Sequence, residues 1–314
     1  MARVVTSGQA ASTAAPLLTD RKTTKQRIET LMSGIFKVCG YLSVVAVALI
    51  TIYMVVLGAP GIGKIGVGEF LFGTEWFPAA TTRDPSFGIL PMILSSIMAT
   101  VGAVIIGVPI GLFTAIYLAE FSKGKITTVL RTVISLLSGI PSVVYGLVGM
   151  IVVVPAVAKI FGLPSGSSLF SAMLILAIMI LPTIVSISEN AIRAVPKEYR
   201  EASLAMGTTQ VYTIFKVVLP AAKSGIAAGI VLGIGRAVGE TMAVIMVAGN
   251  AVNMPGLFNS VRLMTTGIAM EMGYAAGLHR QALFGIGLVL FMFIMVINIV
   301  LNRIIKSEDK EARS

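Results

Sequence analysis

Charged residues are scarce in this chain. Only 12% of its 314 residues are Asp, Glu, Lys or Arg, while 56% are hydrophobic. A soluble domain carries about twice that share of charge. The composition therefore excludes the ordinary soluble classes and indicates an integral membrane protein. One membrane domain is expected, because no large polar insert separates the apolar runs.

Cysteine and histidine are almost absent. The chain has one cysteine, Cys39, and one histidine, His279. A disulfide framework and a cysteine-based metal site both need more than one cysteine. A single histidine likewise excludes a pair of histidine ligands. We therefore expect no metal site, no cofactor and no catalytic residue in this chain, and we interpret both side chains as structural.

One segment has the glycine and lysine spacing of a nucleotide-binding P-loop. It spans residues 58–64, but Ile65 stands where a serine or threonine would bind magnesium, and no buried strand precedes it. The segment Gly233-Ile234-Gly235 also lacks the third glycine of a dinucleotide-binding motif. We therefore expect the chain to carry no ATPase of its own, so that any energy from ATP comes from a partner.

Six apolar runs are long enough to cross a membrane, which takes about 20 helical residues. The third run is interrupted by Gly139-Ile140-Pro141-Ser142, where a broken helix is expected. The sequence thus predicts an all-α, polytopic membrane protein with six transmembrane helices. The six spans are expected at 38–57, 89–119, 132–158, 169–188, 224–248 and 282–302.

The segment before the first span has two parts. Residues 1–23 are rich in Ala, Ser and Thr and predict a flexible tail. Over residues 24–37, apolar side chains recur at helical spacing opposite charged ones. This pattern predicts a short helix that lies on the inner membrane surface.

Lysine and arginine set the expected orientation. Most of the 24 basic residues fall on one side of the membrane if both termini share that side. The positive-inside rule makes that side the cytoplasm. We therefore expect a protein of the cytoplasmic (inner) membrane with both termini in the cytoplasm. The net charge of +10 then belongs to the membrane face rather than to a nucleic-acid site.

Two segments on the expected outer side are long. They span residues 58–88 and 249–281. The second mixes many apolar residues with few charges, which favours a re-entrant or packed helix over a free loop. Contact with an external partner and simple capping of the helix bundle remain open for both.

Two short helices are expected in the polar stretch between the fourth and fifth spans. Pro196 suits a first helical turn, where its missing N–H costs nothing. Gly207 can adopt the left-handed conformation that closes a helix. A second helix is expected over residues 210–219, with Pro220 ending it. A polar element held between two spans has the form of a docking site.

Two charges stand inside the fifth span. Arg236 lies about 20 Å along the helix from Lys223, near the middle of a core of about 30 Å. Glu240 is expected one turn further along the same helix face. A charge at that depth costs at least about 2.5 kcal/mol, so both need partners or a role. A mutually neutralising pair is one interpretation, and a pathway for an anion is the other.

The anion interpretation makes a prediction about selectivity. The fork of Arg236 suits an oxyanion, whereas Glu240 only accepts hydrogen bonds. Glu240 therefore favours an anion that carries a proton, as hydrogen phosphate does and sulfate does not. The same span holds the glycine pairs Gly229/Gly233 and Gly235/Gly239, which favour a close helix–helix interface, with a second permease subunit among the candidates.

The stretch 201–220 resembles the EAA loop of ABC-transporter permease subunits. That motif is EAA, three residues, G, nine residues, then I, any residue and LP, and here Ser203 and Val217 depart from it. The resemblance implies that the stretch is the coupling helix that seats in a cytoplasmic ATP-binding cassette ATPase. The residues implied in coupling are Glu201, Ala202, Gly207, Leu219 and Pro220.

Five further segments resemble the PstC-type permease of the phosphate ABC transporter. They span 72–78, 87–91, 139–146, 193–200 and 233–244, within a similarity that covers about residues 25–305. The resemblance implies the type I ABC permease fold. It also associates Arg236 and Glu240 with phosphate passage.

The same resemblance implies a domain organisation and a set of partners. We expect a cytoplasmic tail at 1–23, a permease domain at 24–306 with its coupling loop at 196–220, and a C-terminal tail at 307–314. The implied partners are a PstA-type sister permease, an ATP-binding cassette ATPase dimer and an extracytoplasmic phosphate-binding protein. The expected function is import of inorganic phosphate across the cytoplasmic membrane, without covalent chemistry by this chain.

Three alternatives remain open. The same architecture accommodates another oxyanion, such as molybdate or sulfate. The chain could instead be an ion-coupled secondary transporter with Arg236 and Glu240 as a proton relay. The coupling loop and the lack of a visible inverted repeat argue against this. A non-transporting membrane scaffold or sensor is the third alternative.

Overall fold

The computed structural model describes residues 24–78, 84–122 and 124–311. The tail expected at 1–23 lies outside them, as do residues 312–314 of the expected C-terminal tail. The chain divides between Thr51 and Ile52 into two compact units, and each is described by itself.

The first helix is longer than expected. α1 runs without interruption from Thr24 to Ile65. The expectation of a separate helix at 24–37 is therefore wrong, because these residues form one helix with the first span, and that helix continues past residue 57. No turn-forming pair of residues separates the two segments, and each added helical residue gains a hydrogen bond. The helix ends only where Gly66 adopts a φ of +97°.

The P-loop-like segment is part of this helix. Residues 58–64 lie in the last turns of α1, with Pro60 inside the helix. A loop that cradles phosphates with successive backbone N–H groups needs those groups free. Here they belong to a regular helix, which agrees with the dismissal of a nucleotide site.

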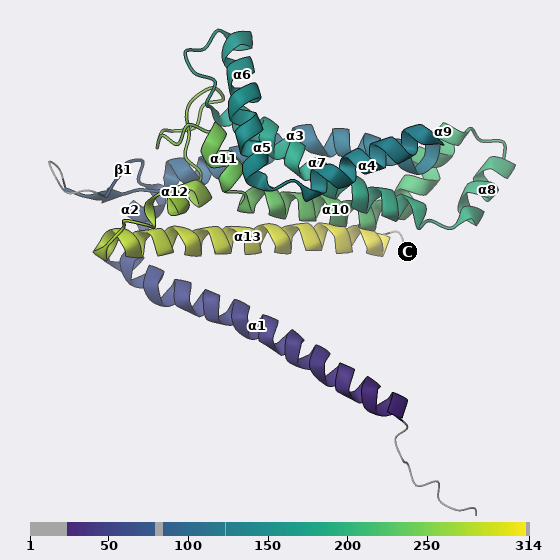
Figure 1. The fold of residues 1–314 in the computed structure, drawn as a ribbon, viewed down its shortest axis with the longest axis horizontal. Helices are drawn as coiled ribbons and strands as arrows, with labels where there is room; N and C mark the ends of the chain where they lie inside the picture. The colour runs from purple at the N-terminus through teal and green to yellow at the C-terminus, as the bar shows by residue number, and fades with distance from the viewer. Residues whose placement is uncertain (1–23, 79–83, 123, 312–314) are drawn as a thin grey trace, which may run out of the picture. The chain divides into compact units, whose positions relative to one another are not determined.

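The second unit is helical apart from one short strand pair (Figure 1). Strands β1 (Trp76–Phe77) and β2 (Ser86–Phe87) pair antiparallel. Helices in the first half are α2 (Val67–Phe72), α3 (Leu90–Ile116), α4 (Lys125–Gly139), α5 (Ser142–Val148), α6 (Val154–Phe161) and α7 (Leu169–Arg193). Those in the second half are α8 (Lys197–Ala205), α9 (Gln210–Thr213), α10 (Leu219–Gly239), α11 (Met242–Val247), α12 (Met264–Glu271) and α13 (Gly277–Glu311).

Three π-helical segments widen the helices of this unit. They are η1 (Tyr117–Phe121), η2 (Gly149–Val153) and η3 (Ile214–Val218). η3 joins α9 to α10, so the helix continues through Leu219 and Pro220. The expectation that Pro220 ends a helix is therefore wrong. Pro220 instead occupies the first turn of α10, where a missing N–H is tolerated.

Six helices in the described residues are long and apolar enough to cross a membrane. Each of them covers most of one expected span, so the predicted all-α, six-helix class is confirmed. The expected break in the third span is also present, since α4 ends at Gly139 and α5 begins at Ser142. Pro141 precedes α5 and cannot continue the ladder of hydrogen bonds.

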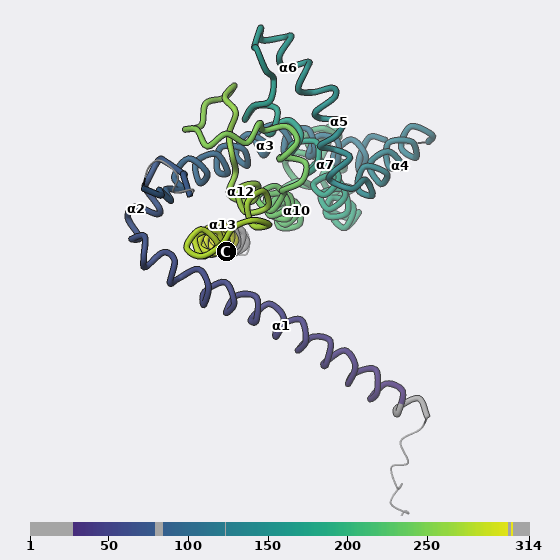
Figure 2. The backbone as a smooth tube through the Cα atoms, turned by 60° about the vertical axis from the view of Figure 1, so that its left-hand side comes forward, coloured from purple at the N-terminus to yellow at the C-terminus, as the bar shows by residue number. Residues whose placement is uncertain are grey.

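α7 is the centre of the second unit. It packs against both α3 and α10 (Figures 1 and 2). Glycines bring the helices close: a Cβ added at Gly107 of α3 would lie 2.8 Å from Ile180, and one at Gly233 of α10 would lie 3.1 Å from Ile184. Close approach of backbones at small residues is the usual means of packing helices in a membrane.

The two glycine pairs of the fifth span have different surroundings. Gly229 and Gly233 are buried against Ile187 and Ile184 of α7, so this pair serves packing within the chain. Gly235 and Gly239 are exposed, and a Cβ added at either meets nothing within 4 Å. Only the second pair is therefore available to another subunit.

The segment 249–281 contains a packed helix, as expected. α12 contacts α13, α3 and α11. Its residues Met264 and Thr266 are fully buried. The Met264 N–H donates to Ser96 Oγ of α3 at 3.0 Å, and the Thr265 hydroxyl donates to the Glu240 carbonyl at 3.0 Å. α12 is thereby tied to two membrane-spanning elements.

Candidate functional site

α8 is an exposed helix that projects from one end of the second unit (Figure 1). None of its residues is buried. Glu201, Ala202 and Gly207 are all exposed, and Met206 exposes 84% of its surface. Leu219 is partly buried and Pro220 exposed, at the start of α10. A helix with no fully buried residue in the described chain leaves most of its surface free to meet another protein.

The turn after α8 has a fixed geometry. Gly207 adopts a φ of +82°, the left-handed conformation that the sequence predicted. The hydroxyls of Ser203, Thr208 and Thr213 lie 2.9 to 3.0 Å from one another. Thr208 also donates to the Ser203 carbonyl at 2.7 Å. These bonds lock α8 and α9 into one unit, in which Ser203 has a role that an alanine at the motif's third position could not fill.

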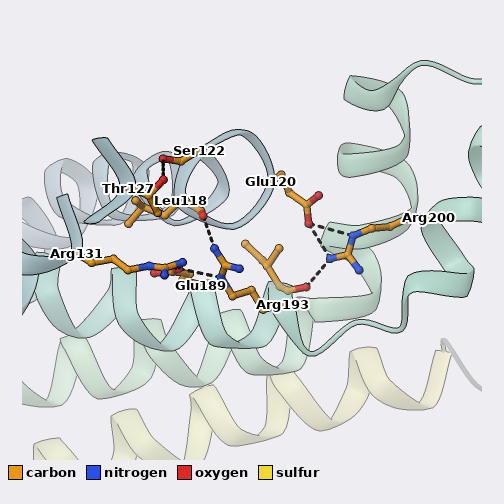
Figure 3. A network of polar contacts seen from close by, with 9 residues as sticks. Leu118, Glu120, Ser122, Thr127, Arg131, Glu189, Arg193 and Arg200 are labelled. Atoms are coloured by element: carbon orange, nitrogen blue, oxygen red, sulfur yellow. Dashed lines mark hydrogen bonds and ion pairs between the residues drawn. The ribbon is translucent and has the colours of Figure 1, made fainter. Parts of the chain in front are cut away.

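Arg200 attaches α8 to the membrane-spanning helices (Figure 3). Its Nε and Nη2 donate to Glu120 Oε1 at 3.2 and 2.7 Å. Nη1 donates to the Val195 carbonyl and Nη2 to the Ile192 carbonyl, at 2.6 and 2.8 Å. One guanidinium thus joins α8 to η1, which continues α3, and to the end of α7. These bonds hold α8 against the ends of both spans.

Sequence reasoning named neither Arg200 nor Glu120 as functional. Arg200 directly precedes the motif residue Glu201, which was the available signal. The carboxylate of Glu120 lies eighty positions earlier, and only the packing of η1 beside α7 brings it to Arg200.

A second cluster of charges lies nearby between α4 and α7 (Figure 3). Arg131 donates from Nε and Nη2 to Glu189 Oε1 at 3.0 and 2.5 Å. Arg193 donates from Nε to the same oxygen at 2.9 Å and from Nη2 to the Leu118 carbonyl at 2.6 Å. Two arginines therefore share one carboxylate, which leaves a local excess of positive charge.

The fifth span breaks at Glu240. α10 ends at Gly239, and Glu240 has an extended backbone with φ −70° and ψ +133°. Its carboxylate Oε1 accepts the Ala243 N–H at 3.1 Å and so caps α11. The expectation that Glu240 continues the helix face of Arg236 is therefore wrong, because the chain leaves the helix one residue before it.

Arg236 and Glu240 do not form an ion pair in the part of the chain that the structure describes. Arg236 is partly exposed and has no hydrogen-bonded protein partner there. The mutually neutralised pair is thus not the arrangement found. The two broken spans meet, since α5 packs against α11.

A third cluster lies at the other end of the unit. Glu271 of α12 is 5% exposed and is bonded to three side chains. Arg262 and the Trp76 indole donate to its two oxygens, the latter at 2.9 Å. His279 Nε2 lies 2.8 Å from Glu271 Oε2. The lone histidine therefore joins α13 to α12, a structural contact that spacing alone did not reveal.

The architecture is that of a polytopic membrane protein with an exposed helix at one end. The chain belongs to the family of binding-protein-dependent transport system inner membrane components, whose model matches residues 107–313. It is 39% identical to a probable ABC transporter permease, YqgH of Bacillus subtilis, over 84% of this chain and 88% of that one. It is 36% identical to the phosphate transport system permease protein PstC of Pasteurella multocida, over 78% and 82%.

Solved structures confirm the type I ABC permease fold. A chain of a bacterial ABC transporter involved in import of the acidic polysaccharide alginate superimposes with a TM-score of 0.61, covering 90% of this chain and 99% of that one at 16% identity. A chain of the MetNI methionine ABC transporter in an inward-facing conformation gives 0.53, covering 70% and 94% at 21% identity. The resemblance to phosphate permeases and the fold expected from it are thus both confirmed.

Proposed function

We propose that this chain is a permease subunit that imports inorganic phosphate across the cytoplasmic membrane, driven by a partner ATPase that docks on α8. The observation that carries the proposal is Arg236, which lies beside the break in the fifth span and has no hydrogen-bonded or ion-paired partner among the described residues. A guanidinium that is not paired with a carboxylate in the described part of the chain is placed to bind an anionic substrate in its fork. The similarity to phosphate permeases names that anion as phosphate.

The orientation follows from the docking role. α8 faces the cytoplasm, and both termini share that side, in agreement with the distribution of lysine and arginine. The opposite end of the second unit, with α12 and the β1–β2 pair, faces outward (Figure 1). The proposed transporter contains three further components: a PstA-type sister permease, an ATP-binding cassette ATPase dimer and an extracytoplasmic phosphate-binding protein.

The proposed domain organisation keeps the expected boundaries. Residues 24–306 form the permease domain, and 196–220 form its coupling loop. Glu201, Ala202 and Gly207 contact the ATPase, while Leu219 and Pro220 form the first turn of α10, through which the loop continues into the fifth span. Hydrolysis takes place in the partner, and the spans alternate between outward and inward openings as the loop moves.

The test is transport by the reconstituted complex with Arg236→Ala. With ATP inside the vesicles and the binding protein outside, we expect uptake of labelled phosphate to fall by at least about tenfold, because a charge-assisted hydrogen bond is worth on the order of 2 kcal/mol. The matched control is Arg280→Ala, which removes an exposed arginine from the outer end. Equal uptake by the two variants would assign Arg236 a structural role.

A further inference from the structure

The cluster of Arg131, Glu189 and Arg193 borders an open pocket between α4 and α7. The pocket has a volume of about 370 Å³. Its remaining lining residues are Ile134, Ser135, Ser186 and Asn190. It lies at the end of the unit where α7 leads to α8, and thus on the cytoplasmic side in the proposed orientation (Figure 3). It is separate from the break at Glu240.

The pocket carries unused hydrogen-bond donors. Arg131 and Arg193 each have five N–H groups, and the bonds described above use two of each. Both side chains remain more than 40% exposed, whereas Glu189 is 10% exposed. The side chains of Ser135, Ser186 and Asn190 form no hydrogen bond with the described residues. Two cations and three neutral polar groups therefore face the same space.

The location of these polar groups argues against a face that lies against lipid tails. Ser186 precedes Arg193 by seven residues, so it lies about 10 Å from the end of α7 toward the membrane core. Polar side chains at such depth face a bundle interior or a water-filled cavity, since lipid offers them no partner. The pocket therefore opens to water that enters from the cytoplasmic side or to the interior of the assembled complex.

We propose that this pocket binds a phosphate group, supplied as free inorganic phosphate from the cytoplasmic side, so that it forms an inner subsite at the exit of the pathway. This proposal rests on the proposed import function. Arg131 and Arg193 contribute the charge, and their position around one carboxylate holds both guanidinium planes at the pocket edge. Ser135, Ser186 and Asn190 provide further donors to the phosphate oxygens.

Glu189 gives the subsite a preference for a protonated anion. All three arginine donors converge on Oε1, and Oε2 has no partner among the described residues. An acceptor beside an anion site favours a ligand that brings its own proton, as hydrogen phosphate does. Removal of the carboxylate charge in Glu189→Gln is expected to let sulfate compete with phosphate.

The experiment measures binding of labelled inorganic phosphate to the complex of all membrane and ATPase subunits in nanodiscs of phosphatidylcholine. The Arg236→Ala background removes the proposed pathway site. In that background, Arg131→Gln should bind phosphate about tenfold more weakly, the value of one charge-assisted hydrogen bond. Lys125→Gln is the matched control, because it removes a cation from the first turn of the same helix but outside the pocket, and it should bind as the background does.

Two further measurements serve as controls: a conservative variant and a change of lipid. Arg131→Lys keeps the charge and loses the fork, so it should bind with intermediate affinity if the complex is intact, as judged by gel filtration. Nanodiscs that contain phosphatidylglycerol test whether a lipid headgroup is the source of the phosphate group. Undiminished binding of free phosphate in these nanodiscs supports the proposal. Loss of phosphate binding in them would overturn the proposal and indicate that the pocket binds a lipid headgroup.

Transport by the same preparations separates the two proposals. ATP-driven phosphate import by the unsubstituted complex, with equal phosphate binding in Arg131→Gln and its background, would overturn the inner subsite alone. Phosphate binding that depends on Arg131, without any ATP-driven import, would instead overturn the import function and retain the pocket as an anion site.

Discussion

Arg200 and Glu120 lie eighty residues apart in the chain and are joined by two hydrogen bonds to a single carboxylate oxygen. The side chain of Arg200 is 20% exposed and that of Glu120 is 10% exposed. It links the exposed helix α8 with the end of the second membrane-spanning segment. α8 has no buried residue, so this pair and the hydroxyl bonds of Ser203 are the side-chain contacts that hold it in place.

The first prediction concerns this joint. Arg200→Ala leaves Glu120 without its partner and frees α8 from the Val195 and Ile192 carbonyls. We expect phosphate import per ATP hydrolysed to fall by on the order of tenfold, since hydrogen bonds to charged groups contribute about 1.5 to 3 kcal/mol. Import and hydrolysis are measured together in vesicles. Lys197→Ala on the exposed face of α8 is the control, and an equal loss there would reject the joint as the specific cause.

The second prediction concerns the turn after α8. A Cβ at Gly207 meets nothing within 4 Å, so space does not limit substitution, but its φ of +82° does. Gly207→Ala should destabilise the turn by about 1 to 2 kcal/mol, and Gly207→Asn by less, because asparagine tolerates this conformation. The measure is binding of the ATPase to the membrane subunits. Equal binding by the alanine and asparagine variants would contradict the conformational argument.

The third prediction concerns Glu240. A glutamine retains a carbonyl oxygen that accepts the Ala243 N–H, so Glu240→Gln should keep the cap of α11. Glu240→Ala removes this acceptor and should destabilise α11 by about 1 kcal/mol. Loss of the negative charge should also let sulfate enter a pathway that otherwise favours hydrogen phosphate. Uptake of both labelled anions is compared. Unchanged exclusion of sulfate by the glutamine variant would reject the selectivity role.

The fourth prediction separates the two glycine pairs of α10. A Cβ added at Gly229 would lie only 3.1 Å from Ile187. Gly229→Leu places a larger side chain there, so this variant should fail to accumulate as folded protein. A Cβ added at Gly235 meets nothing within 4 Å, so Gly235→Leu should fold. If Gly235 contacts the sister permease, the variant should co-purify with less of that subunit. Full co-purification would place the subunit interface elsewhere.

Much of the fold followed from the sequence because each cue was local. Long uncharged runs identify spans by the cost of placing charge in lipid, and Pro141 and Gly207 mark the broken span and the closed turn through backbone geometry alone. The errors arose where local cues had two outcomes. Pro220 fits both the end of one helix and the first turn of the next, and π-helical residues before it allow the second.

The candidate site was only partly predictable. Arg236 and Glu240 were identifiable as costly intramembrane charges, yet their separation depends on a backbone break that no periodicity marks. The contacts of Arg200 with Glu120 and of Arg131 with Glu189 join residues from different helices. Such pairs are set by helix packing, and a single sequence does not encode that in any spacing.

The most direct test of the central claim is uptake of labelled phosphate by vesicles that hold the complete, unsubstituted complex. ATP is enclosed in one set and ADP with an imposed ion gradient in another, and the binding protein is outside both. We expect phosphate uptake with ATP alone, with little uptake of sulfate or molybdate. Uptake on the ion gradient without ATP would contradict it, as would ATP-driven uptake that does not discriminate phosphate from the other two anions.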